Sequence, residues 1–325
     1  MWRRSSPHPA SPLARVVTPA DRRVARPVPW RVYAGLVLAQ VLWASLYPAS
    51  KPLLQMVTPA QVALVRGVTA WLLLTALALL VSGPQAFRAA LRRPLGPLIL
   101  GWLSFFGSST IMLLALHDLP AAVNGVLNNT SPLWLALGAL LLGRARPLTV
   151  LGTLLALLGV AVILLGDSLL FLLATPLALS PRGVALALLG SGVIALSHVW
   201  GRRVMVGSDP LVMTGLSAGF AVPPLLVVAE LTGGLAALGA VPLPAALLLL
   251  YVGVGCTAVN FALWFWALKH LSPTRAAPFQ YLIPPLGVVL AWLALGEPPT
   301  PGLLLGTALV LGGIALTQRP EPASR

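Results

Sequence analysis

Ten long apolar runs separated by short breaks constrain the fold of this 325-residue chain more than any other feature of its sequence. The breaks contain proline, glycine or charge, as in "SGPQAFRAALRRPLG" and "LGEPPTP". Only 9% of the residues are charged, against about 25% in soluble domains, which is too few to cover a water-facing surface. A helix needs about 20 residues to cross a bilayer. The sequence therefore predicts an all-α polytopic membrane protein with ten transmembrane helices, at 32–54, 60–81, 95–116, 120–142, 148–166, 183–201, 211–231, 245–268, 274–295 and 301–318.

The distribution of basic residues predicts the orientation of these spans. If the N-terminus is cytoplasmic, 18 of the 21 lysines and arginines fall in cytoplasmic segments. The outer loops then hold only Lys51 and Arg182, as expected where positive charge stays inside. We expect a protein of the cell (inner) membrane with both termini cytoplasmic: a disordered basic tail at 1–31 and a short C-terminal tail at 319–325. The first tail lacks the apolar core of a secretory signal peptide.

The net charge of +14 does not indicate a nucleic-acid partner, because the basic residues lie in the tail and in short gaps between apolar runs. One cysteine, Cys256, excludes an intrachain disulfide and a cysteine-rich metal site. We expect no cofactor and no metal. The expected partners are a small-molecule substrate and the lipid bilayer, and the expected state is a monomer or a homodimer.

An internal repeat relates the two halves with an offset of 152 residues, the separation of Ala115 and Ala267. At both positions a segment opens with Ala-Leu-x-x-Leu, and each segment has a proline at the same depth, Pro132 and Pro284. Each half contains five predicted spans. Because five is odd, the second half enters the membrane from the opposite side, which gives an inverted repeat. In transporters such repeats place the substrate site near the midplane, between the halves.

Three motifs carry a resemblance to a known family. They are "PAQVALVRG" at the second span, the Ala-Leu-x-x-Leu junctions, and the ending "LALGEPPTPGLLLGTALVLGGIAL". With them the chain resembles the drug/metabolite transporter superfamily, specifically its EamA-type ten-helix permeases, over roughly residues 32–318. The resemblance implies two EamA-like five-helix repeats, at 32–166 and 183–318. It also implies secondary transport without ATP: export or exchange of small metabolites, amino acids or drugs by alternating access.

The stretch "NGVLNNTSP" places three asparagines in the fourth span. Asn124 and Asn128 share one helical face, and Asn129 lies about 100° round from Asn128. At the repeat offset Asn128 matches Gln280 and Asn129 matches Tyr281. Such side chains can bond neighbouring helices together, or they can line a substrate cavity. The matched pair in the second half favours the cavity, and neutral amides suit amino-acid-like or other small polar or amphipathic ligands.

Other polar and aromatic side chains within the spans complete the expected substrate site. They lie in the first, third, sixth and eighth spans, and the third and eighth spans carry polar groups at equivalent positions of the repeat. These candidates are Gln40, Trp43, Tyr47, Ser108, His198, Asn260 and Trp264.

Three charged or titratable residues near the membrane have open interpretations. Arg66 lies about 9 Å into the second span, from where it can extend to the interface or bind an anionic group or an exposed carbonyl in the bundle. His198 is either a hydrogen-bonded packing residue or a proton carrier. Lys51 follows the first span, where a cation complements the helix dipole, and we assign it no further role.

Two other classes of protein fit the sequence less well. A membrane-embedded enzyme acting on lipid-linked groups needs a nucleophile–base pair or a cluster of metal-binding side chains, and we find no catalytic residues. A channel or scaffold would not need two inverted halves. No Asp or Glu lies in the middle of a span, so proton exchange on a membrane glutamate, as in the small multidrug resistance branch, is not expected.

Overall fold

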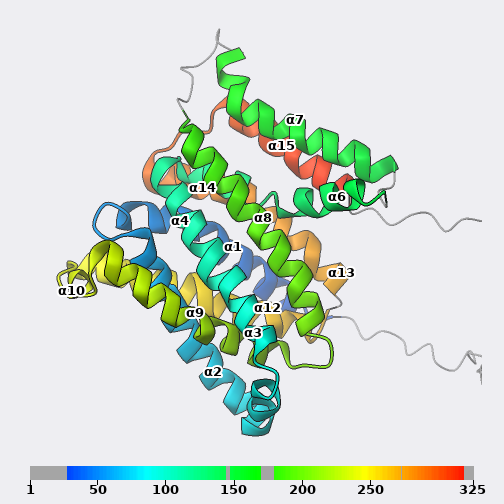
Figure 1. Cartoon of the computed structure of the whole chain (residues 1–325). Coiled ribbons are helices and arrows are strands. Elements are labelled where there is room, and N and C mark those ends of the chain that lie inside the picture. Colours follow the sequence, from blue (N-terminus) through cyan, green and yellow to red (C-terminus); the bar gives the residue numbers. More distant parts are fainter. Residues whose placement is uncertain (1–27, 144–146, 170–178, 272, 318–325) are drawn as a thin grey trace, which may run out of the picture.

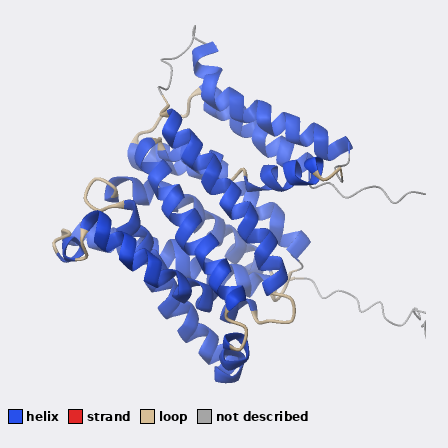
Figure 2. Ribbon diagram, viewed as in Figure 1, coloured by secondary structure: helices blue, strands red, loops and turns tan. Residues whose placement is uncertain are grey.

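The computed structural model describes residues 28–143, 147–169, 179–271 and 273–317, and in these residues every regular element is a helix (Figures 1 and 2). The predicted all-α class is confirmed. The elements are α1 (Trp30–Leu53), α2 (Pro59–Leu91), α3 (Leu95–Gly101), η2 (Trp102–Ser108), α4 (Ser109–Asp118), α5 (Ala121–Asn128), α6 (Ser131–Leu141), α7 (Pro147–Leu169), α8 (Pro181–Val204), α9 (Pro210–Gly233), α10 (Ala236–Gly239), α11 (Leu243–Leu250), η3 (Tyr251–Val259), α12 (Asn260–Leu268), α13 (Pro273–Ala276), η4 (Ala277–Leu282), α14 (Ile283–Leu295) and α15 (Pro301–Thr317).

Helical elements lie in each of the ten predicted segments. In the described part of the chain, seven helical stretches are long and apolar enough to cross a membrane, and two shorter apolar stretches are Pro147–Ile163 and Pro301–Leu316. The remaining span is divided into α5 and α6. The chain is therefore a polytopic α-helical membrane protein.

Helical structure continues beyond the predicted end of the second span at residue 81, after a break in the helix. Helix α2 continues to Leu91 through a kink at Gly83, whose φ of 75° is outside the helical region. Glycine adopts this conformation without a Cβ clash, and Pro84 follows it. Apolar length alone could not show this extension, because residues 82–91 are polar enough to resemble a loop.

The two halves share local backbone features at matching positions. The third span of each half contains a π-helical segment, η2 in the first and η3 in the second, at matching depth. The fourth span of each half is followed by a glycine in the left-handed region, Gly143 with φ 64° and Gly296 with φ 68°. The second span of each half begins at a proline preceded by a side-chain cap, Thr58 in α2 and Asp209 in α9. The π-helical segment, the glycine and the helix cap therefore each occur once in each half.

The cap of α9 also holds the kinked end of α2. Asp209 accepts hydrogen bonds from the backbone N–H groups of Leu211 and Val212 and from the Ser82 hydroxyl, the last at 2.6 Å. Burial alone would raise the pKa of Asp209, but the hydrogen bonds from Ser82, Val212 and Leu211 favour the carboxylate, so the pKa lies below its ordinary value.

Corresponding helices of the two halves pack symmetrically. Helix α1 packs on α12 and α14 of the second half, and α8 packs on α4 and α5 of the first. The α2–α9 and α7–α15 pairs each join equivalent helices. In Figure 1, α7 and α15 lie side by side, next to the bundle and near α6. The core between α1, α2, α5 and η3 consequently receives side chains from both halves.

Candidate functional site

The Tyr47 hydroxyl lies at the centre of the polar groups that the structure brings together. Asn129 donates to it from Nδ2 at 3.1 Å, and Asn128 does so at 3.4 Å. Asn129 also donates to the Gly125 carbonyl at 2.7 Å. Tyr47 and Asn128 are buried, so the contact between α1 and the end of α5 is shielded from bulk solvent.

This contact exists because the fourth span breaks between α5 and α6. Asn129 (φ −86°, ψ 9°) and Thr130 (φ −81°, ψ 11°) leave the helical conformation. Pro132 occupies one of the first two positions of α6, where its missing N–H and fixed φ are tolerated. The fourth span therefore breaks directly after Asn128, beside the two asparagines whose side chains contact Tyr47 of α1.

Arg66 is buried beside this group. Its Nε donates to Thr257 Oγ1 of η3 at 3.2 Å, and its Nη1 has no hydrogen-bond partner in the described part of the protein. Its guanidinium lies within electrostatic range of Tyr47 and Cys256. Arg66 therefore does not extend to the interface.

The π-helical segment η3 contributes a second polar contact that sequence reasoning missed. Ser45 Oγ of α1 lies 2.6 Å from Tyr251 Oη and 3.5 Å from Cys256 Sγ. Thr257 donates to the Val252 carbonyl five residues earlier, as π-helical geometry allows. The sequence signal for this contact was a run of polar and small residues, "YVGVGCT", within an apolar span. The π-helical conformation of this run is a second indication, since π-bulges occur frequently at functional sites.

Aromatic side chains lie one helical turn along α1 from Tyr47. The Trp43 ring is 5.6 Å from Phe261 and 6.0 Å from Trp264, measured between ring centroids. Phe105 is 5.6 Å from Phe261. Both halves supply this aromatic group, which gives the polar group an apolar neighbour.

Several predicted site residues instead bond within or between helices. Asn124 donates to the Met112 carbonyl at 3.2 Å, and Asn260 donates to the Ala39 carbonyl at 3.1 Å. Gln40 and Ser108 donate to carbonyls of their own helical stretches. These contacts match the packing role that the sequence left open. The side-chain carbonyl oxygens of Asn124, Asn260 and Gln40 nevertheless have no partner in the described residues.

Three further candidates make no hydrogen bond to the Tyr47 group in the described residues. Gln280 and Tyr281 are half-buried in η4, and the Tyr281 hydroxyl is buried without a partner among the described residues. His198 lies on an exposed face of α8 and makes no hydrogen bond in the described part of the chain. The structure thus brings Tyr47, Asn128, Asn129, Arg66, Trp43 and Trp264 into one region of the bundle.

At the predicted outer end, Lys51 and Glu297 hold the junction between α4 and α5. Lys51 Nζ donates to the carbonyls of Leu116, His117 and Leu119 at 2.6, 3.3 and 2.6 Å. These groups belong to the C-terminal end of α4, whose partial negative charge favours a cation. Lys51 thus caps a helix other than its own, a role that the sequence did not reveal.

The Glu297 carboxylate caps the helix on the other side of the junction. It accepts hydrogen bonds from the N–H groups of Ala121 and Ala122, the first residues of α5, at 2.9 and 3.1 Å. A carboxylate is favourable at a helix N-terminus, where the N–H groups have no intrahelical partner. Glu297 follows α14, so this contact joins the second half to the first.

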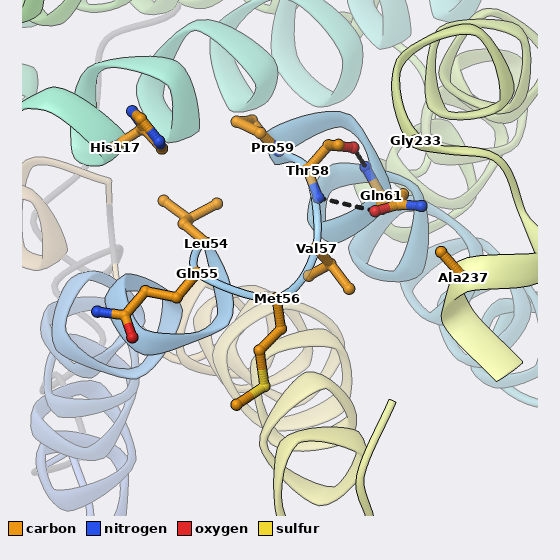
Figure 3. Close-up of a pocket in the computed structure, with 10 residues that line it drawn as sticks. All are labelled: Leu54, Gln55, Met56, Val57, Thr58, Pro59, Gln61, His117, Gly233 and Ala237. Atoms are coloured by element: carbon orange, nitrogen blue, oxygen red, sulfur yellow. Dashed lines mark hydrogen bonds between the residues drawn. The ribbon is translucent and has the colours of Figure 1, made fainter. Parts of the chain in front are cut away.

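A pocket of about 390 Å³ lies beside this junction, over the turn between α1 and α2 (Figure 3). Gln61 accepts from the Thr58 N–H at 2.7 Å and donates to the Gly234 carbonyl at 2.7 Å. Both ends of the Gln61 side-chain amide are therefore already hydrogen-bonded within the protein. The pocket is lined by Leu54, Gln55, Met56, Val57, Thr58, Pro59, Gln61, His117, Gly233 and Ala237, none of which belongs to the predicted substrate site.

The described residues contain no group of three or more His, Cys, Asp or Glu side chains able to hold a metal ion. Two inverted five-helix halves, with polar and aromatic groups where the halves meet, define the class of polytopic membrane transporters. The EamA-like transporter family model matches residues 30–165 and again 181–319. The chain belongs to this family, and it is a multi-pass membrane transporter of small molecules.

Known proteins agree with this assignment. The uncharacterized transporter YdfC of Bacillus subtilis is 26% identical over 282 residues, which cover 85% of this chain and 87% of YdfC. An uncharacterized transporter of Archaeoglobus fulgidus is 26% identical over 204 residues, 63% of this chain and 69% of its own length.

Two further proteins are similar to this chain over a short segment or in fold alone. A "probable terminal-alkyne amino-acid exporter" of Streptantibioticus cattleyicolor is 36% identical over 78 residues, which are 24% of this chain and 26% of that exporter. A crystal structure with 23% sequence identity has a TM-score of 0.59 and covers 89% of this chain and 96% of its own. That second likeness concerns the fold alone.

Proposed function

We propose that this protein is a secondary carrier that exports a small polar or amphipathic metabolite, of amino-acid-like chemistry, by alternating access. The observation that carries the proposal is the buried group around Tyr47. Asn128 and Asn129 bind its hydroxyl, and Arg66 lies within electrostatic range of it. The exporter of Streptantibioticus cattleyicolor, which is named for an amino acid, supports the substrate class over the part that it shares with this chain.

The hydrogen-bonding capacity of this group fits a polar ligand. Asn128 Oδ1 is buried without a partner in the described residues, and a buried acceptor left unpaired costs about 1–3 kcal/mol. A substrate N–H or O–H group would satisfy it. The aromatic side chains Trp43 and Trp264 would then contact the apolar part of the same molecule.

The junction at Glu297 supports alternating access. A carboxylate of the second half is hydrogen-bonded to the first turn of α5, which ends at Asn128. Closing and opening this contact would move the two halves relative to each other at one end of the site. Inverted repeats give carriers a second arrangement in which the opposite end is closed.

Asn128→Leu tests the site, with Asn124→Leu as its matched control one turn earlier on α5. The proposal expects Asn128→Leu to weaken substrate affinity by roughly 5- to 150-fold, from about 1–3 kcal/mol for an unpaired hydrogen-bonding group, with little change in thermal stability. Asn124 bonds to Met112, so Asn124→Leu should lower stability and leave affinity unchanged. Normal affinity with lowered stability in the Asn128 variant would contradict the site.

Counterflow in proteoliposomes tests the carrier mechanism. A panel of labelled amino acids and related metabolites is offered outside vesicles that are preloaded with the same unlabelled compound. A carrier accumulates label transiently by exchange, whereas a channel only equilibrates it. Equilibration without overshoot would contradict alternating access, and loss of overshoot in Asn128→Leu would assign the exchange to this site.

A further inference from the structure

We propose that Arg66 binds a carboxylate group of the transported molecule, so that the carrier selects substrates that carry one carboxylate. This inference rests on the proposed carrier function and names a charged group of its substrate. Arg66 is only 8% exposed, and Nη1 has no hydrogen-bond partner among the described residues. A buried charge is stable only when it is paired, and arginine remains charged in proteins.

The acidic side chains that the structure describes are all engaged elsewhere. Each of them binds backbone N–H groups, a hydroxyl or a basic side chain at a helix end, and none contacts Arg66. These side chains are Asp118, Asp209, Glu230 and Glu297. Within the described part of the chain, the positive charge of Arg66 therefore has no protein carboxylate opposite it.

The geometry of Arg66 is prepared for an anion. Thr257 accepts from Nε and donates its own hydroxyl to the Val252 carbonyl, so its orientation is determined. This leaves the two terminal nitrogens of the guanidinium without a protein hydrogen bond in the described residues. Paired donors of this kind match the two oxygens of a carboxylate, and such charge-assisted bonds are about twice as strong as neutral ones.

The charge balance favours one carboxylate over a phosphate. Arg66 is the only basic residue that the sequence places inside a span away from its ends. Lys51, at the end of the first span, donates its hydrogen bonds to carbonyls at the end of α4. One guanidinium neutralises one carboxylate, whereas a dianionic phosphate would leave a negative charge buried in the bundle. Near Tyr47, the unpaired acceptor Asn128 Oδ1 could then bind an N–H or O–H donor of the substrate whose carboxylate binds Arg66.

Benzoate and its neutral isostere benzamide provide a direct test that does not depend on knowing the substrate. Thermal unfolding of the purified full chain in a neutral detergent is followed at constant ionic strength while either compound is titrated. We expect benzoate to stabilise the wild type and benzamide to have at least tenfold lower apparent affinity. Arg66→Gln should lose benzoate affinity by about 10- to 150-fold, and Arg66→Lys should retain part of it.

Arg182→Gln is the control, because Arg182 is an exposed arginine beside Asp118 at a helix end. It should keep the full preference for benzoate. No stabilisation of the wild type by benzoate, or equal stabilisation of Arg66→Gln, would overturn the proposal. A purely structural Arg66 predicts that outcome, with lowered stability of Arg66→Gln in the absence of any ligand.

The two proposals fail in distinguishable ways. If every metabolite equilibrates without counterflow while benzoate discriminates between wild type and Arg66→Gln, the carrier mechanism is wrong and the anion site stands. If counterflow of neutral compounds is found and is unchanged in Arg66→Gln, the anion site is wrong and the carrier mechanism stands.

Discussion

Replacing Glu297 by alanine should open the predicted outer end of the bundle. The carboxylate accepts two hydrogen bonds, at 2.9 and 3.1 Å, from the first turn of α5, and it belongs to the other half of the molecule. Removing it leaves two N–H groups of a helix N-terminus without this partner. The substitution therefore destabilises the closed arrangement. It does not destabilise an open arrangement, in which water already solvates the two N–H groups.

The magnitude follows from the nature of these bonds. A hydrogen bond to a charged group contributes about 1.5–3 kcal/mol. Because Glu297 is only half-buried, we assign this value to the pair of bonds together and not to each. Since about 1.4 kcal/mol corresponds to a factor of ten, the equilibrium between open and closed arrangements should shift roughly 10- to 150-fold toward the open one.

Cysteine labelling measures this shift. Ala122 is 3% exposed, so in a Cys256→Ala background Ala122→Cys should react slowly with a thiol reagent in detergent. Adding Glu297→Ala should accelerate labelling by the factor above. Glu297→Gln should have a smaller effect, because an amide oxygen still accepts a hydrogen bond but carries no charge.

The matched control is Glu230→Ala. Glu230 accepts from the Leu235 N–H at 2.7 Å, a contact within the second half that does not join the halves. Labelling at position 122 should be unchanged by this variant. Equal acceleration by Glu230→Ala and Glu297→Ala would refute the reasoning. So would acceleration at a buried position far from the junction, such as Ala156→Cys in α7, because that result would indicate general unfolding.

Three other predictions concern packing, orientation and a helix cap. Gly306→Val should destabilise the α7–α15 pair by about 1–3 kcal/mol, because a Cβ there would meet the α7 backbone, whereas Gly312→Val has room; thermal unfolding in detergent compares them. Reporter fusions after Arg93 should report cytoplasm and those after Asp118 the outside, and a reversed pattern would contradict the orientation. Asp209→Ala should lower stability by about 0.5–2 kcal/mol through loss of the α9 cap. Because the pKa of Asp209 is lowered on folding, this difference should be complete above about pH 4 and vanish as pH falls through the lowered pKa; a difference that persists in acid would refute it.

The sequence by itself determined the class, the ten spans and the duplication. Apolar length and the scarcity of charge are properties of the local chain, and a bilayer converts them directly into helices. Pro132 lies next to the break in the fourth span, and the missing N–H of proline acts within one turn. The assignment of Asn128, Asn129 and Tyr47 to a substrate site stays a prediction, although the structure shows that these three side chains meet.

Only the tertiary structure decided the contacts between distant segments. Arg66 bonds to Thr257, 191 residues away, and Glu297 bonds to the start of α5, 176 residues away. Nothing in the local sequence distinguishes Lys51 as a cap for α4 from a lysine at the end of its own helix. Whether a polar side chain in a span joins helices, as Asn124 does, or gathers with others, as Asn128 does, depends on which helix lies opposite it. That is a property of how the two halves interleave, and the periodicity of a single helix does not encode it.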